Sequence, residues 1–428
     1  MSQFAELLPP NLLFAALGDS ITARNGRAKD GFVGLYNHGI LTRLRAELRQ
    51  RLDSRQALNF GVGGDTTGQM LARMGAAEAS EAQALTFLGG TNDAAARLPL
   101  DTTFANYEAI LGRARSRFAL TVVMAVLPRS SWPAYFTPED AAEGQRKLRA
   151  MNHWLRGYCT AREGVLFVDT FTPWLDPDTG GPRPGFTEDG VHQSTPGADA
   201  AALALAAALD PLLPAEGWPL HAGPEDGFDA ATRPGGNKLH NPGLGGTDGA
   251  AIGGATGQVA DRWVLLTSQP GNIGLVEGSK EAAADRLGDW QVVTITGRQG
   301  ANESISLNSH VELAEARYAP GESLRAAVEF QLLDPVNVAD PGLRWGDLPG
   351  TGAPGFESRD FCAFNGNIVG PARSRRGVLL TDPHQLLAPT GTGPQRQVVS
   401  LQINLVSSMP GGASGVVKFR RPTLRRVG

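Results

Sequence analysis

The stretch Leu12-Leu13-Phe14-Ala15-Ala16-Leu17-Gly18-Asp19-Ser20-Ile21-Thr22 determines how the first half of the chain is interpreted. Its apolar run, Leu12–Leu17, is short enough for a buried strand, and the Gly-Asp-Ser that follows is typical of a tight turn. In open α/β sheets, ligands bind outside the carboxyl ends of the strands. The hydroxyl of Ser20 is therefore predicted to lie at the reactive edge of such a sheet.

The pattern of residues 12–213 alternates between strand and helix. Alternation of this kind predicts a parallel sheet with helices on both faces, the α/β class. The further expected strands are Ala57–Phe60, Ala84–Leu88, Leu120–Leu127 and Val165–Val168. The expected helices are Tyr36–Asp53, Thr67–Ala79, Thr103–Phe118, Glu139–Ala161 and Pro196–Leu213.

The pattern changes near residue 214. The stretch 214–236 is rich in Gly and Pro and is predicted to be a linker. Beyond it, short β-rich runs separated by turns predict an all-β sandwich, with a weak helical period near Lys280–Leu287. The predicted domains are 1–213, 214–236 as the linker, and 237–428, in keeping with a length of 428 residues.

Charge and composition argue against several classes of protein. The net charge is −4 and there is no run of basic residues, which argues against nucleic acid or an anionic membrane as the main partner. The longest aliphatic stretch, Ala200–Leu209, is too short to cross a bilayer, and the N-terminus lacks the pattern of a signal peptide. We expect a soluble protein, with its compartment left open. Neither the two cysteines, Cys159 and Cys362, nor the seven histidines show metal-ligand spacing, so no metal or other cofactor is expected.

Three later segments carry what a nucleophilic serine needs: Gly61-Val62-Gly63-Gly64-Asp65-Thr66, Gly90-Thr91-Asn92-Asp93 and Asp189-Gly190-Val191-His192. Serine requires an adjacent base, for which His192 is the candidate. Asp189, three residues earlier, is placed to orient the imidazole. Acyl transfer also needs fixed donors for an oxyanion, and the candidates are the N–H groups of Ser20 and Gly64 with the amide of Asn92.

Each segment taken alone has another interpretation. The glycines at 61–64 resemble a phosphate cradle, but the Lys-Ser/Thr of a P-loop is absent. Asn92 alone suits a helix cap, and Asp189 with His192 suits a surface pair. The occurrence of all the segments together, each near a predicted strand end, favours catalysis.

In this chain order the four segments resemble the four blocks of the SGNH (GDSL) hydrolase superfamily, over roughly residues 12–213. The resemblance implies a flavodoxin-like three-layer α/β/α fold and a metal-free triad of Ser20, His192 and Asp189. It also implies an oxyanion hole of Ser20, Gly64 and Asn92, and esterase activity. Our leading hypothesis is an O-acetylesterase of a carbohydrate. A lipase or thioesterase for longer acyl groups, and a glycan-binding or particle-structural protein with a secondary hydrolase domain, stay open.

The β-rich half loosely resembles jelly-roll carbohydrate-binding modules, through Asn237–Leu244, Trp263, Trp290 and Phe419–Arg425. Its tryptophans, with Trp345, either stack on sugar rings or belong to the core, and the core is favoured for Trp263 and Trp290. Glycan binding, oligomerisation and docking on a larger particle are open roles for this half. Gly31–Tyr36 and Trp132–Phe136 either line the substrate pocket or pack beneath loops.

Overall fold

The computed structural model describes residues 8, 11–25, 39–215, 217–299, 303–339, 341–348, 355–360, 374–386, 396–405 and 411–427. These residues form two compact units, which meet along the chain at Gly217 and Trp218. The predicted boundaries of the linker stay a prediction. Cys362 and Gly31–Tyr36 lie outside the described residues.

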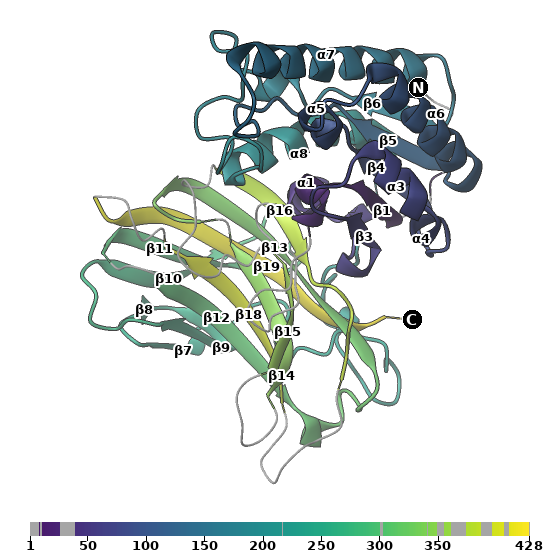
Figure 1. The fold of residues 1–428 in the computed structure, drawn as a ribbon. Helices are drawn as coiled ribbons and strands as arrows, with labels where there is room; N and C mark the ends of the chain where they lie inside the picture. Colours follow the sequence, from purple (N-terminus) through teal and green to yellow (C-terminus); the bar gives the residue numbers. More distant parts are fainter. Residues whose placement is uncertain are drawn as a thin grey trace. The chain divides into compact units, whose positions relative to one another are not determined.

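The first unit contains a parallel sheet with the strand order β2-β1-β4-β5-β6, and β3 pairs with β1 (Figure 1). The strands are β1 (Leu12–Gly18), β2 (Leu52–Asp53), β3 (Asn59–Gly61), β4 (Ala84–Leu88), β5 (Leu120–Met124) and β6 (Val165–Val168). The helices are α1 (Ser20–Ala23), α2 (Ile40–Glu47), α3 (Thr67–Arg73), α4 (Gly75–Glu78), α5 (Thr91–Ala95), α6 (Leu100–Arg117), α7 (Pro138–Thr160) and α8 (Thr195–Leu209).

Successive residues of β1 point into two different cores. Leu12 and Phe14 pack in a cluster with the apolar residues of α2 and α8. Leu13 and Leu17 pack in a second cluster with α3, α6 and α7. A strand whose two faces are both buried is a continuous apolar run in the sequence, as Leu12–Leu17 is. The unit is thus a three-layer α/β/α domain, as predicted.

The register of the sheet brings the turns that follow β1, β3 and β4 to the same edge. Gly18, the last residue of β1, is paired with Gly61 of β3 on one side and Leu88 of β4 on the other. A Cβ on Gly18 would lie 2.1 Å from Thr22 Oγ1, and one on Gly61 would lie 2.2 Å from the Ala23 nitrogen. Both positions need glycine because α1 folds back tightly over the strand ends.

Some element boundaries differ from expectation. The single helix expected over 67–79 is two short helices, α3 and α4. The last expected helix ends at Leu209 and is followed by a 3₁₀ turn, Asp210–Leu212. Pro211 lies in that turn, and proline has no N–H with which to continue α-helical bonding.

The second unit is a β sandwich, as predicted (Figure 1). One described sheet runs β16-β13-β19-β11-β10-β8 with β17 on β13, and the other runs β15-β14-β18-β12-β9-β7. The strands are β7 (Asp248–Ile252), β8 (Thr256–Gly257), β9 (Val259–Thr267), β10 (Leu275–Ala282), β11 (Asp289–Arg298), β12 (Ser304–Glu312), β13 (Ser323–Val336), β14 (Gly342–Leu348), β15 (Gly355–Asp360), β16 (Arg375–Leu380), β17 (His384–Gln385), β18 (Arg396–Asn404) and β19 (Ala413–Arg426).

The weak helical period near Lys280–Leu287 does not correspond to a helix: its first residues belong to β10, where Lys280 lies opposite Gln291 of β11, and the rest form the turn before β11. Cross-strand pairing outweighs local propensity there. Trp263, Trp290 and Trp345 are all buried, so these three rings are core residues rather than sugar-stacking platforms.

Part of the Gly/Pro-rich stretch packs on the sandwich. Trp218 and Leu220 join a small apolar cluster with residues of β13 and β16. Asp226 accepts from Arg425 of β19. Within the described residues no helix is both long and apolar enough to cross a membrane.

Candidate active site

Ser20 is the first residue of α1, directly after β1. Asp19 caps this helix, its Oδ1 accepting a hydrogen bond of 2.9 Å from the Ile21 N–H. The cap fixes the sharp change from strand to helix at which the serine is placed.

A chain of short hydrogen bonds runs from Ser20 through His192 to Asp189. His192 Nε2 lies 2.8 Å from Ser20 Oγ, although the two residues are 172 positions apart. His192 Nδ1 lies 2.6 Å from Asp189 Oδ2. The structure therefore brings the three predicted triad residues together in the order that nucleophilic catalysis requires.

Asp189 is held in its ionised form. Its Oδ1 accepts from the backbone N–H groups of Val191 and His192 at 3.0 and 2.8 Å. Partial burial acts to raise the pKa of Asp189, but these N–H groups and the His192 ring outweigh it and lower the pKa to about 2. A carboxylate that stays charged keeps the proton on Nδ1 and leaves Nε2 as the base.

The loop that carries His192 is anchored on both sides. The carbonyl of Gly190, a residue with φ of +86°, accepts from the N–H groups of Ser130 and Ser131. Ser194 caps α8, accepting from the Gly197 N–H. The buried Gln193 side chain donates to the Ile21 carbonyl at 3.0 Å, which ties this loop to α1. His192 and Ser20 are therefore held against each other by the neighbouring backbone.

The predicted oxyanion donors lie at the same strand ends. A Cβ on Gly63 would lie 3.9 Å from Ser20 Cβ, so the glycine turn runs beside the serine. Gly64 has a φ of +83°, in the left-handed region that glycine favours. The Asn92 amide donates one bond of 2.9 Å to the carbonyl of Asp65, the residue after Gly64. A primary amide has two N–H donors, so one remains for a ligand.

Arg73 is a residue that no motif pointed to. From the end of α3 its Nε donates to Asp65 Oδ2 at 2.5 Å, its Nη1 to the Phe60 carbonyl at 2.5 Å, and its Nη2 to the Gly18 carbonyl at 2.7 Å. One guanidinium thus joins the turn before Ser20 to the turn that contains Gly64. Its helical position carries no sequence signal of this role.

Two buried carboxylates lie beneath the site. Asp93 accepts from both the N–H and the hydroxyl of Thr67 and so holds the start of α3. Burial raises the pKa of Asp19 to about 7; the Ile21 N–H and Arg129 oppose this rise and Asp93 adds to it. The second oxygen of Asp19, Oδ2, is buried without a hydrogen-bond partner among the described residues.

An aromatic cluster lies in the loop after β5. Trp132 and Phe136 stack with ring centroids 5.5 Å apart, and Arg97 lies 4.6 Å over the Phe136 ring. Tyr135, which is 67% exposed, packs against Phe136 and under Arg97. This loop adjoins the His192 loop through Ser130 and Ser131. Trp132 and Phe136 are packing residues, whereas Tyr135 presents its ring to solvent.

No group of three or more His, Cys, Asp and Glu side chains is arranged to hold a metal in the part of the chain that the structure describes. The arrangement of Ser20, His192 and Asp189 supplies a nucleophile, a base and a fixed charge from the chain itself. It has the parts that acyl transfer needs.

A search of curated proteins found no match. Among solved structures, the chain is similar to a GDSL-like lipase from Bacteroides thetaiotaomicron (21% identity, 50% of this chain and 96% of that chain, TM-score 0.38). It is also similar to a lipase/acylhydrolase from Enterococcus faecalis (18% identity, 48% of this chain and 98% of that chain, TM-score 0.37).

The sequence profile of one family covers the segments that build the site. The profile of the GDSL-like Lipase/Acylhydrolase family matches residues 16–200, from within β1 to within α8. The matched range contains Ser20, Gly64, Asn92, Asp189 and His192. Residues 16–200 therefore form a domain of the GDSL-like lipase/acylhydrolase family, a family of ester hydrolases.

Proposed function

We propose that the protein is a serine O-acetylesterase that removes acetyl groups from a carbohydrate through an acyl-enzyme. The observation that carries the proposal is the hydrogen-bonded chain from Ser20 Oγ through His192 to Asp189, at 2.8 and 2.6 Å. Ester hydrolysis itself follows from the family.

In the first half of the reaction Ser20 Oγ attacks the ester carbonyl carbon. His192 Nε2 accepts the serine proton, and the carboxylate of Asp189 stabilises the imidazolium through Nδ1–H. The carbonyl oxygen becomes an oxyanion, which accepts from the N–H groups of Ser20 and Gly64 and from the Asn92 amide. The intermediate then collapses, and His192 returns the proton to the departing sugar oxygen.

In the second half a water molecule attacks the acetyl-serine ester. His192 removes a proton from this water, the same donors stabilise the second oxyanion, and the collapse protonates Ser20 Oγ and releases acetate. Each proton taken up by His192 is thus returned within the same half-reaction. Asp189 remains ionised throughout, in keeping with its low pKa.

The solvent exposure of the His192 and Asp189 side chains supports an ester whose alcohol part is large and polar. The His192 side chain is 25% exposed and that of Asp189 is 50% exposed. A long acyl chain gains binding energy only where apolar walls remove it from water, and a half-exposed catalytic carboxylate does not suit such a channel. A small acetyl group on a large polar alcohol fits an open site.

Tyr135 supports a sugar as the alcohol. Among the large apolar residues that are exposed in the described chain, Tyr135 is aromatic and the others are aliphatic. Its ring is held by Phe136 and Arg97, and its hydroxyl lies 3.5 Å from the carbonyl of Ala95, one helical turn beyond Asn92. A fixed aromatic ring with a polar end is suited to the C–H face and hydroxyls of a sugar.

The proposal is tested by measuring acetate release from a panel of O-acetylated polysaccharides, with wild type and Ser20→Ala. In parallel, p-nitrophenyl esters of two to twelve acyl carbons report acyl length. We expect acetate release by wild type only, and a preference for the two-carbon ester. Hydrolysis confined to long-chain esters would instead identify a lipase, and equal rates for Ser20→Ala would remove the proposed mechanism.

A further inference from the structure

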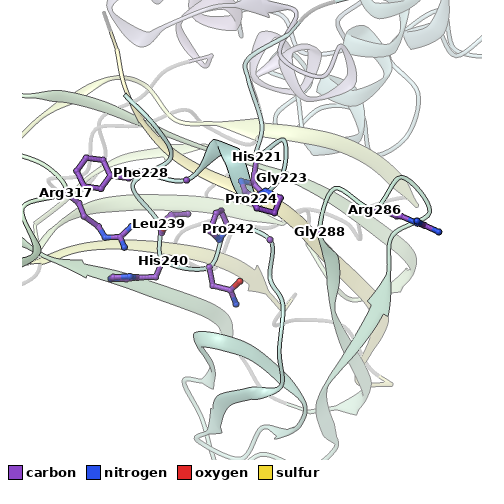
Figure 2. Close-up of a pocket in the computed structure, with 13 residues that line it drawn as sticks. His221, Gly223, Pro224, Phe228, Leu239, His240, Pro242, Arg286, Gly288 and Arg317 are labelled. Atoms are coloured by element: carbon purple, nitrogen blue, oxygen red, sulfur yellow. Dashed lines mark hydrogen bonds between the residues drawn. The ribbon is translucent and has the colours of Figure 1, made fainter. Parts of the chain in front are cut away.

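A cavity of about 410 Å³ lies in the sandwich unit, outside the ester-hydrolysing domain (Figure 2). Its walls come from the segment 221–243, from the loop between β10 and β11, and from Arg317. Small-molecule sites in proteins commonly measure about 300–1,000 Å³. The cavity is therefore large enough for a ligand of monosaccharide size.

The charged side chains that line this cavity are cationic. Arg286 and Arg317 lie at opposite ends in Figure 2, and no aspartate or glutamate lines the space between them in the described chain. The nearest carboxylate on the Arg317 side, that of Glu315, lies 2.6 Å from His240 Nε2 and 3.4 Å from Arg317 Nε. The single carboxylate of Glu315 offsets at most one of the two arginine charges, which leaves an excess of positive charge.

Arg317 has donor capacity that its protein contacts do not use. Its Nη1 donates long bonds of 3.3 and 3.4 Å to the carbonyls of Lys238 and Leu239. Its Nη2 makes no hydrogen bond to any described residue. Figure 2 shows the guanidinium between the Phe228 ring and His240, and its Cζ lies 5.7 Å from the centre of that ring. A planar guanidinium in this position is suited to a carboxylate.

His221 supplies a second polar contact in the same cavity. It is 5% exposed, and its Nδ1 lies 3.4 Å from Asp226 Oδ2. A Cβ on Gly243 would lie 3.7 Å from its Nε2, which makes no hydrogen bond within the described chain. Burial and the charges of Arg425 and Arg421 lower the pKa of His221, although Asp226 opposes them. A neutral imidazole offers Nε2 to a hydroxyl group.

We infer that this cavity binds a hydroxylated organic acid of monosaccharide size, with its carboxylate on Arg317 and a hydroxyl on His221. Asn241 does not compete for the ligand, because its amide already bonds to Gly245 and Asp261. Phe228 and the neighbouring prolines, Pro224 and Pro242, give the apolar wall. A neutral sugar would leave the Nη2 donors of Arg317 without an anionic acceptor.

The test uses the full chain and a matched pair of ligands that differ only in the carboxylate, glucuronate and glucose. Titration calorimetry should show glucuronate binding about tenfold or more tightly than glucose, as a charged hydrogen bond implies. Arg317→Met should lower glucuronate affinity by about tenfold or more, and His221→Phe should lower it by a smaller factor. Arg262→Met, which removes an exposed arginine of the same unit outside the cavity, should leave it within about twofold of wild type.

The outcomes separate this inference from the proposed function. Ser20→Ala should bind glucuronate as wild type does, because the cavity does not depend on catalysis. Equal affinities for glucose and glucuronate, no binding of either, or an unchanged affinity in a folded Arg317→Met would overturn the inference. Tight binding of glucose 6-phosphate without glucuronate would also overturn it, in favour of a phosphate ligand. Thermal unfolding of each variant shows whether it is folded.

Discussion

Arg73 Nη2 donates to the carbonyl oxygen of Gly18 at 2.7 Å and so ties the end of α3 to the turn that presents Ser20. The same guanidinium holds the Phe60 carbonyl and the carboxylate of Asp65. The carbonyl of Asp65 in turn accepts from Asn92. The nucleophile turn, the glycine turn and Asn92 are thus connected through one side chain that does not itself take part in the chemistry.

Replacing Arg73 should therefore slow the reaction without weakening substrate binding. Displacing catalytic groups by about 1 Å can cost about 10²-fold in rate, so we expect Arg73→Met to lower kcat by about 10- to 100-fold with KM within about twofold. Arg73→Lys should recover little, because an ammonium lacks the planar set of donors. Steady-state kinetics with p-nitrophenyl acetate measure both constants.

The control is Arg113→Met, which removes an exposed arginine paired with Glu78 on the surface of the same unit. Surface ion pairs contribute about 0–1 kcal/mol, so this variant should keep wild-type kinetics. If Arg73→Met is folded and its kcat is unchanged, the positioning role is wrong.

Asn92→Ala should lower kcat by about 10²–10³-fold, the usual effect of removing one oxyanion donor. KM should change little, because the lost hydrogen bond forms fully only in the transition state. Asn106→Ala is a suitable comparison, since it removes an amide of α6 that donates to the Thr67 hydroxyl instead. Equal kinetic losses in the two variants would show that Asn92 acts through loop structure rather than on the oxyanion.

The raised pKa of Asp19 predicts that the free energy of unfolding depends on pH. Its pKa is about 7 in the folded chain and 3.8 in its unperturbed form. Between these values the native state binds more protons than the unfolded state, so this group makes the free energy of unfolding fall as pH rises. Asp19→Asn keeps an oxygen for the Ile21 N–H but does not titrate, and its stability should vary less with pH.

Urea unfolding of wild type and Asp19→Asn at pH values of about 5 and about 8 measures this difference. The variant should gain stability relative to wild type at the higher pH. A parallel pH dependence in the two proteins would show that Asp19 has an ordinary pKa in the folded chain.

Tyr135 should raise kcat/KM for acetyl esters whose leaving group is a sugar. We expect Tyr135→Ala to lower kcat/KM on an acetylated oligosaccharide by about tenfold, since aromatic contacts are worth about 0.5–1.5 kcal/mol beyond buried area. Tyr135→Phe should retain most of the activity because the ring remains. Vinyl acetate, whose leaving group is too small to reach a stacking ring, should be hydrolysed equally by all three proteins. A loss of equal size on both substrates would argue for a disturbed site instead.

The strands of the first unit could be predicted because strands of a sheet covered on both faces are short, continuous apolar runs in the sequence. Ala84–Leu88 and Val165–Val168 are buried or half-buried strands of a parallel sheet, and their observed bounds are those predicted. The distances between Ser20, His192 and Asp189 could not be predicted, because Asp189 and His192 lie in the loop between β6 and α8, well past the end of the strand. The occurrence of the four segments in their chain order is what indicated that these residues would meet. The geometry places these residues within hydrogen-bond distance of one another.

Other features depend on contacts that no local pattern records. Arg73 lies in an ordinary helix, and its importance comes from carbonyls 13 and 55 positions away. The weak helical period near Lys280–Leu287 overlaps the end of β10, which is a strand because β11 pairs with it. The sandwich cavity joins His221 and Arg317, residues from loops far apart in the chain, and was not predicted at all.

The central claim is that Ser20 forms the covalent intermediate. The most direct measurement is labelling of the folded protein with a fluorophosphonate probe, followed by peptide mapping by mass spectrometry. We expect the label on Ser20, with esterase activity lost in proportion to labelling, and no label in Ser20→Ala. Labelling at another residue in step with the loss of activity, or full esterase activity in Ser20→Ala, would contradict the claim.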